Sequence, residues 1–180
     1  GQLPGGIGRD LLVSQKDLSG GEGIHASQNI QQGGLARAAG THDDTQFSRL
    51  KEIFAKDSLQ MCTFTITEKG YNLNTPDGNF MAAVAEDMKN GPERPESYIG
   101  KVAALVYARY VSGKKPLAMV SMDNCSHNGD KLFAAVDAYA KAWTENGKAE
   151  KGFLEYIENP AKVSFPWSMI DKITPRPAKA

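Results

Sequence analysis

Residues 116–129 read Pro-Leu-Ala-Met-Val-Ser-Met-Asp-Asn-Cys-Ser-His-Asn-Gly: an apolar run, then a polar loop. The run 116–122 predicts a buried strand. A helix should follow at once, because the next apolar side chains recur at helical spacing. These side chains are Leu132, Phe133, Val136, Tyr139, Ala140 and Trp143. A strand that leads into a helix indicates an α/β fold.

The same alternation occurs on both sides of this stretch. Residues 59–67, Leu-Gln-Met-Cys-Thr-Phe-Thr-Ile-Thr, are rich in β-branched and aromatic side chains and predict another buried strand. Helices are expected over 43–56, from Asp77 to Asn90, over 97–112 and over 153–157, with a third strand at 163–165. Strands that are apolar on both faces and separated by helices favour a mostly parallel sheet flanked by helices. Ligands of such sheets bind beyond the carboxyl ends of the strands.

The first forty residues differ from the rest, because they contain ten of the 18 glycines. No helical or strand period holds for long there, so we expect irregular structure with room for one short strand or helical turn. We divide the chain into a glycine-rich segment, 1–42, and an α/β domain, 43–180. Two glycine clusters, 5–8 and 20–23, superficially resemble phosphate-binding loops. Neither follows a convincing strand or has the G-x-G-x-x-G spacing, so both are discounted.

Composition narrows the functional classes. The chain has 180 residues, with 21 basic and 21 acidic side chains and no net charge. That length suits one domain, and the neutral charge argues against non-specific nucleic-acid binding. The apolar runs are too short to span a membrane, and no secretory signal is visible in the sequence. Cys62 and Cys125 do not make a disulfide framework, so we expect a cytoplasmic protein. From the charge and the short apolar runs, we expect no nucleic-acid and no membrane partner.

Two polar loops are candidate sites, each with a structural alternative. After the strand at 116–122, the amide of Asn124 could donate to a developing oxyanion. Alternatively, Asn124 forms an Asx turn, and Asn128 or Asp130 caps the next helix. After the strand at 59–67, the hydroxyls and glycine of 65–71 could line a dinucleotide, although such a sequence is also typical of a solvated turn.

Metal and nucleophile patterns are absent from the sequence. The three histidines, His25, His42 and His127, are scattered without ligand spacing, so no metal site is predicted. Cys62 lies within a predicted strand and is expected to be a core residue. No G-x-S-x-G sequence, which would indicate a nucleophilic serine, is present.

Three clusters in this order resemble the mannitol dehydrogenase family, that is, the long-chain polyol dehydrogenases and hexuronate reductases. They are Thr-Ile-Thr-Glu-Lys-Gly-Tyr at 65–71, Asp123-Asn124 with Asn128-Gly129, and Phe-Pro-x-Ser-Met-Ile-Asp-x-Ile-Thr-Pro at 165–175. The resemblance covers roughly residues 43–177, the later part of the family's N-terminal Rossmann domain. It implies a Rossmann-like fold that is incomplete at the N-terminus.

The resemblance also implies an activity and a set of site residues. The activity is a metal-independent interconversion of a polyol and a ketose, or of an aldonate and a keto-uronate, with NAD or NADP. Asn124 would hold the substrate oxygen in an oxyanion hole. Thr67, Glu68, Asp123 and Asp171 would bind the cofactor. The substrate would be a polyol or a sugar acid.

Departures from the family pattern limit what this chain is expected to do. Trp167 stands where the family usually has Asn, and Lys172 where it usually has Arg. The family's phosphate loop is not recognisable, and its general base is a lysine in a helical C-terminal catalytic domain. We expect that domain, a partner from the same polypeptide, to be absent and the 180 residues alone to be inactive. The alternative is a catalytically silent binding or interaction module that retained the fold.

Overall fold

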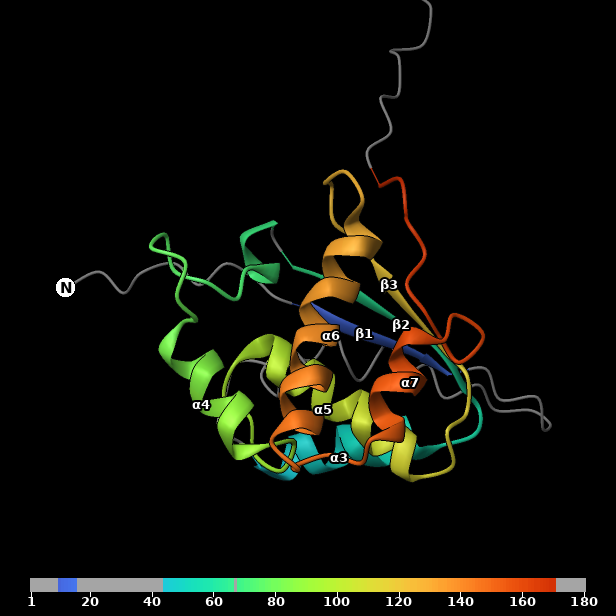
Figure 1. Ribbon diagram of the computed structural model, residues 1–180. Coiled ribbons are helices and arrows are strands. Elements are labelled where there is room, and N and C mark those ends of the chain that lie inside the picture. The colour runs from blue at the N-terminus through green and yellow to red at the C-terminus, as the bar shows by residue number, and fades with distance from the viewer. Residues whose placement is uncertain (1–9, 16–43, 67, 171–180) are drawn as a thin grey trace, which may run out of the picture.

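The computed structural model describes residues 10–15, 44–66 and 68–170. Helices and strands alternate through most of this part of the chain (Figure 1). Their order is β1 (Asp10–Gln15), α3 (Asp44–Ala55), β2 (Leu59–Thr65), the short 3-10 helix η1 (Glu68–Tyr71), α4 (Ala82–Asn90), α5 (Tyr98–Val111), β3 (Leu117–Ser121), α6 (Asn128–Glu145), α7 (Gly152–Glu158) and β4 (Val163–Ser164).

The strands form one sheet in the order β1-β2-β3-β4. β2, β3 and β4 run parallel, and β1 pairs antiparallel with β2. The predicted α/β fold with a mostly parallel sheet flanked by helices is therefore confirmed, and β1 is the short strand allowed for in the first forty residues. Phe64 of β2 is paired with Ser121 of β3, so both strands end at the same level of the sheet.

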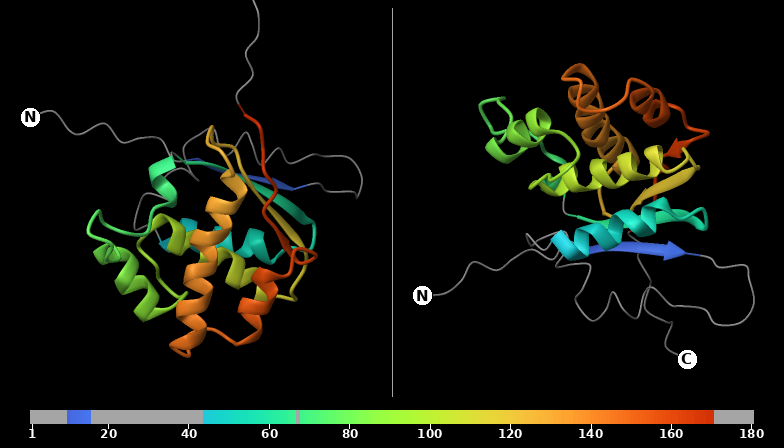
Figure 2. Two further views of the ribbon diagram at one scale, coloured as in Figure 1. Left: turned by 45° about the horizontal axis from the view of Figure 1, so that its top comes forward. Right: turned by 90° about the horizontal axis from the view of Figure 1, so that it is seen from below.

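The two faces of the sheet are not buried alike. In β2, Cys62 and Phe64 are fully buried, whereas Met61 is 38% exposed. In β3, Leu117 and Met119 are likewise buried. The helices lie together on one side of the strands in the left view of Figure 2. The expectation that β2 is apolar and buried on both faces is therefore wrong, because the helices cover one face.

One predicted helix begins later than expected. α4 starts at Ala82, not at Asp77, because residues 74–80 close into a turn. The Thr75 hydroxyl donates to the Asp77 carboxylate, and it lies 2.9 Å from the carbonyl oxygen of Asn79. Phe80, predicted on the apolar face of that helix, is 49% exposed. Short polar side chains here bond to the nearby backbone in preference to starting a helix.

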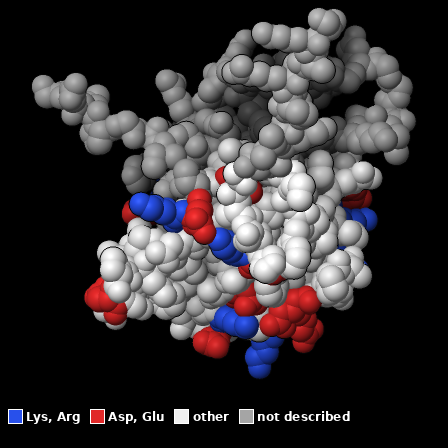
Figure 3. All heavy atoms as spheres, turned by 90° about the horizontal axis from the view of Figure 1, so that it is seen from above, with Lys and Arg blue, Asp and Glu red and all other residues white. Residues whose placement is uncertain are grey.

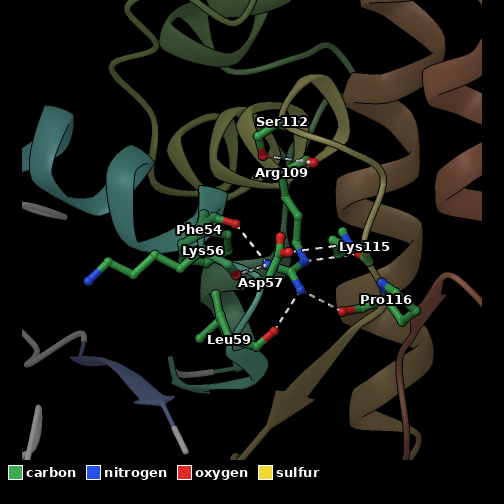
Figure 4. Close-up of polar contacts among 8 residues, drawn as sticks. All are labelled: Phe54, Lys56, Asp57, Leu59, Arg109, Ser112, Lys115 and Pro116. Atoms are coloured by element: carbon green, nitrogen blue, oxygen red, sulfur yellow. Dashed lines mark hydrogen bonds and ion pairs between the residues drawn. The ribbon is translucent and has the colours of Figure 1, made fainter. Parts of the chain in front are cut away.

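A buried arginine, Arg109 of α5, organises the amino ends of β2 and β3 (Figure 4). Its side chain is 1% exposed. All five of its N–H groups donate to backbone carbonyl oxygens, at 2.6–2.9 Å. The acceptors belong to Phe54, Lys56, Leu59, Lys115 and Pro116. We call these six residues the Arg109 cluster; it joins the end of α3 to the starts of β2 and β3.

Burial lowers the pKa of the Arg109 guanidinium from its ordinary value, and the nearby Tyr156 and Cys62 act in the opposite direction. The group stays charged because arginine is not deprotonated in proteins. Its charge is compensated by carbonyl dipoles, including that of Phe54 in the last turn of α3, where a cation is favoured.

The other polar anchor of the helical layer is Asp87 of α4. Its carboxylate accepts from the backbone N–H groups of Glu96 and Ser97 just before α5, at 2.7 and 2.8 Å. Its carbonyl oxygen accepts from the indole of Trp143 in α6 at 2.8 Å. α4, α5 and α6 are thereby fixed to one another. Within the described residues, the helices include none long and apolar enough to cross a membrane.

Candidate functional site

The loop that follows β3 and the segment 165–170 that follows β4 lie side by side at the top of Figure 1. Parallel strands present their carboxyl ends at one edge of the sheet, where open α/β sheets bind ligands. Two hydrogen-bond clusters build this edge, one around Asp123 and one around Asn128.

The Asp123 cluster consists of Ile66, Tyr71, Ser121 and Asp123. The buried carboxylate of Asp123 accepts from the Ile66 backbone N–H at 3.0 Å, from the Tyr71 hydroxyl, and from the Ser121 hydroxyl at 3.4 Å. The Tyr71 and Ser121 hydroxyl oxygens lie 2.5 Å apart. Burial, and next the hydrogen bond to Asp123, raise the pKa of Tyr71 far above its ordinary value. The cluster therefore joins η1 to the ends of β2 and β3 through a neutral phenol.

The Asn128 cluster ties the segment after β4 to the end of β3. Asn128 is the first residue of α6 and is 1% exposed. Its Nδ2 donates to the carbonyl oxygens of Asp123 at 3.0 Å and Ser168 at 2.9 Å, and lies 2.9 Å from Ser168 Oγ. Its Oδ1 accepts from the backbone N–H of Ser168 at 3.1 Å. The Ser168 hydroxyl in turn donates to the Ser121 carbonyl oxygen. The cluster comprises Ser121, Asp123, Asn128 and Ser168.

Gly129 allows the backbone of the segment after β4 to approach the first turn of α6 closely. A Cβ at this position would lie 2.3 Å from the Phe165 carbonyl oxygen and 2.8 Å from that of Pro166. Only a residue without a side chain allows two backbones to approach in this way. The adjacent Phe165 ring packs edge-on against Phe133 of α6, with centroids 5.3 Å apart.

Trp167 covers the start of α6 from the solvent side. The ring centroids of Trp167 and His127 lie 4.3 Å apart, and the Trp167 Nε1 donates to the Asp130 carboxylate at 2.8 Å. The predicted cap of α6 is corrected here: the N-cap residue is His127, in a left-handed conformation and with no side-chain cap bond. The Asn128 Oδ1 accepts from the neighbouring Gly129 N–H at 2.8 Å, and the same side chain also reaches Ser168, 40 residues away.

Exposed polar groups border these buried clusters. Asn124 is exposed in the loop after β3. Glu68 of η1 forms a 2.5 Å ion pair with Lys131 of α6, and a hydrogen bond from Lys131 lowers the pKa of Glu68. Burial raises the pKa of the Cys125 thiol, which makes it a poor nucleophile at neutral pH. In Figure 3, a view from above Figure 1, Lys and Arg lie beside Asp and Glu.

Two surface features lie near the edge. Four exposed apolar side chains follow β3 and β4: Met122, Trp167, Met169 and Ile170. A groove of about 640 Å³ runs between the 68–80 stretch and α6, with Tyr71, Phe80 and Lys131 in its wall. Among the described residues, no group of His, Cys, Asp and Glu is placed to hold a metal ion.

Some of the predicted site residues lie together in the structure, and others lie outside the described residues. Asp123 and Asn124 stand side by side, one buried and one exposed, and Glu68 lies on the neighbouring η1. Thr67 and Asp171 lie outside the described residues. Tyr71, Ser121 and Ser168 are site residues that were not predicted individually, although Tyr71 and Ser168 lie within two of the three motifs.

These features define the class: an α/β domain with a polar site at the carboxyl edge of a parallel sheet. The model of the mannitol dehydrogenase Rossmann domain matches residues 24–180. The chain therefore belongs to the mannitol dehydrogenase family, a family of oxidoreductases.

Relatives in the family agree with this assignment. The chain is 49% identical over 139 residues to D-mannonate oxidoreductase of Thermotoga maritima, covering 77% of this chain and 25% of that protein. It is 36% identical to polyol:NADP oxidoreductase of Gluconobacter oxydans, covering 66% of this chain and 23% of that protein. The crystal structure of D-sorbitol dehydrogenase in substrate-free form matches with a TM-score of 0.53 and 31% identity, covering 66% of this chain and 23% of that one. The chain spans about a quarter of the length of these curated relatives.

Proposed function

We propose that this chain is the nucleotide-binding portion of an NAD(P)-dependent oxidoreductase that interconverts an aldonate and a keto-uronate. The observation that carries the proposal is the similarity to a protein named for D-mannonate, an aldonate, at 49% identity. The relatives named for polyols are less similar, for example at 36%. We therefore favour a sugar acid over a polyol as the substrate.

The carboxyl edge suits the nicotinamide half of the cofactor. The exposed amide of Asn124 and several exposed apolar side chains lie beside buried, hydrogen-bonded polar clusters. A nicotinamide riboside presents both an apolar ring face and hydrogen-bonding groups, so a site of mixed character fits it. When bound, the nicotinamide accepts or returns a hydride at C4.

The proposed roles of Asn124, Glu68 and Asp123 follow from these positions, and those of Thr67 and Asp171 follow from the family resemblance. The Asn124 amide donates to the substrate oxygen and stabilises the charge that develops on it as the carbon–oxygen bond order changes. Glu68, with Thr67 and Asp171, contacts the cofactor. The Asp123 carboxylate is buried and accepts from Ile66, Tyr71 and Ser121, so it supports the cofactor crevice from within.

The oxidation also needs a proton acceptor. As the carbinol carbon gives up a hydride, its hydroxyl proton passes to a general base. In the family this base is a lysine in the motif K-x-x-x-x-N-x-x-H. The one similar string here begins at Lys141 and has Ala149 in place of the histidine. We therefore propose that the 180-residue chain binds the cofactor without turnover.

A titration of NADH and NADPH fluorescence tests the proposal on the chain itself. We expect saturable binding of one of the two, weakened in Asp171→Ala and unchanged in Asn90→Ala, an exposed amide on α4. D-mannonate should give no NAD(P)H with the chain alone. If neither cofactor binds, the proposal fails and the alternative, a silent interaction module, is favoured.

A further inference from the structure

The Asn128 cluster joins two stretches of chain that border the proposed cofactor site. On one side is the loop after β3, which carries Asn124; on the other is the segment 165–170. The carbonyl oxygens of Asp123 and Ser168 accept from the same nitrogen, Nδ2 of Asn128, at 3.0 and 2.9 Å. One side chain therefore fixes the separation of the two stretches.

We infer that Asn128 is a positioning residue: its amide holds the segment 165–170 against the loop after β3, so that the two form one wall of the cofactor crevice. This inference rests on the proposed function. Asn128 has no role in the chemistry itself, because its side chain is buried and used by protein groups.

The pairing with Ser168 needs an amide. Oδ1 accepts the Ser168 N–H, while Nδ2 donates to the Ser168 carbonyl oxygen, so the side chain pairs with both backbone groups of that residue. An amide offers two donor hydrogens and an acceptor oxygen, whereas an ionised carboxylate only accepts. An aspartate at 128 would have nearly the same shape but would face the Asp123 and Ser168 carbonyl oxygens with a negative charge.

Trp167 provides a reporter that is independent of any ligand. Its indole N–H donates to Asp130, whereas that of the fully buried Trp143 donates to the Asp87 carbonyl oxygen. Each indole N–H gives its own resonance in a ¹H–¹⁵N spectrum. The Trp167 resonance reports whether the segment is held on α6, and the Trp143 resonance reports whether the core is intact.

In Asn128→Asp we expect the Trp167 indole to lose its contacts with Asp130 and His127, so that its resonance moves to the position seen in the urea-unfolded chain. The Trp143 resonance should stay in place. The matched control is Asn146→Ala, at the other end of α6, where the amide donates to Met88. It should leave both resonances unchanged. A Trp167 resonance that keeps its wild-type position in Asn128→Asp would overturn the inference.

Ser168→Pro tests the same pairing from the other side and does not alter α6. It removes the backbone N–H that Asn128 Oδ1 accepts, and it also removes the Ser168 hydroxyl. Because the change lies outside the helices and strands, it keeps the test decisive if Asn128→Asp does not fold. We expect Trp167 to be released with an unchanged Trp143 resonance, and retention of Trp167 would contradict the inference.

Cofactor affinity is the functional readout. If the segment is held in only about a tenth of the molecules, the apparent dissociation constant for NADH rises about tenfold. Asn128→Asp and Ser168→Pro should show this rise, and Asn146→Ala should not. If Trp167 is released while NADH affinity is unchanged, the positioning role is refuted. If the wild-type chain binds neither NADH nor NADPH, the proposed function fails, and the Trp167 resonances still decide whether Asn128 holds the segment.

Discussion

The two ends of the parallel sheet are held by hydrogen-bond clusters of different chemistry. At the amino end, the Arg109 cluster uses one cation and five backbone carbonyl oxygens (Figure 4). At the carboxyl end, the Asp123 and Asn128 clusters use carboxylate, phenol, hydroxyl and amide side chains. Backbone acceptors are supplied by any sequence, whereas the carboxyl end depends on the identity of several side chains.

This difference separates a stabilising role from a positioning role. The Arg109 cluster is buried and joins elements far from the polar edge, so its loss should affect the whole fold. The clusters at the carboxyl end lie directly beneath exposed groups such as Asn124, so their loss should mainly change local geometry. Four principal substitutions, with accompanying variants, test the contrast.

The largest effect is expected from Arg109→Ala. It leaves five carbonyl oxygens without their donor, and bonds to charged groups are strong, so the free energy of unfolding should fall by about 4 kcal/mol or more. Urea denaturation measures it. Arg109→Lys keeps the charge but has three donors in place of five, and should recover only part of the loss.

The control for this pair is Arg49→Ala. Arg49 lies on the exposed side of α3 and pairs with Glu52 at 2.5 Å. An exposed ion pair adds little, so this variant should unfold close to the wild type. If Arg109→Ala were as stable as Arg49→Ala, the contrast between the two ends of the sheet would be lost.

Gly129→Ala comes next. Helix propensity alone predicts a gain of up to about 1 kcal/mol. The new Cβ, however, would overlap the carbonyl oxygens of Phe165 and Pro166, and overpacking costs about 1–3 kcal/mol. We expect net destabilisation by about 1–2 kcal/mol in urea, together with release of Trp167. A stabilised variant would mean that the close approach does not constrain the segment.

Tyr71→Phe removes the phenol from the Asp123 cluster and should cost about 1 kcal/mol. Its effect should also depend on pH. Burial raises the pKa of Tyr71. Above pH ~10, the unfolded chain therefore loses the phenol proton of Tyr71, whereas the folded state keeps it. The unfolded state then binds fewer protons, so the free energy of unfolding falls as pH rises.

Urea denaturation at pH values between about 9 and 11 measures this slope. Burial raises the pKa of Tyr156 to about 12, and it also raises the pKa of Tyr139 and of the Cys62 thiol above their ordinary values. These groups keep part of the slope in every variant. The slope should therefore be shallower in Tyr71→Phe, but not zero. An unchanged slope would refute the neutral, buried phenol as a part of the cluster.

The smallest effect on stability is expected for Glu68→Gln. The ion pair with Lys131 is exposed, so the thermal midpoint should barely change. The hydrogen bond and charge of Lys131 lower the pKa of Glu68, so the Glu68 carboxyl should titrate at a higher pH in Lys131→Met. An NMR titration of the side-chain carboxyl measures this shift. A large fall of the thermal midpoint in Glu68→Gln would mean that the Glu68–Lys131 ion pair, like the Arg109 cluster, stabilises the whole fold.

The sequence predicted the elements that depend on local pattern. Helix α5 follows from the helical spacing of Ile99, Val102 and Val106, and β2 and β3 follow from short apolar runs. The predicted start of α4 at Asp77 is wrong, because the Thr75 hydroxyl donates to the Asp77 carboxylate and the chain forms a turn there. Periodicity describes which face is apolar, but it does not include such competition between side chain and backbone.

The polar clusters could be predicted only in part. The motif around Asn128 was recognised, but the partner of its amide, Ser168, lies 40 residues away. Arg109 gave no signal, since a cation on a helix is ordinarily expected at the surface. Its acceptors are backbone carbonyl oxygens, and a sequence does not show which backbone groups will accept a hydrogen bond. They are those of Phe54, Lys56, Leu59, Lys115 and Pro116.

The Arg109 cluster also has a consequence for folding. Its acceptors before β2 are separated from Arg109 by 50–55 residues along the chain. A partly folded chain that buries Arg109 in α5 before β2 is in place would hold a cation with several donors unsatisfied, which is unfavourable. Intermediates of this kind are therefore disfavoured, and α3, β2, α5 and β3 should be gained and lost together as a single cooperative unit in hydrogen exchange.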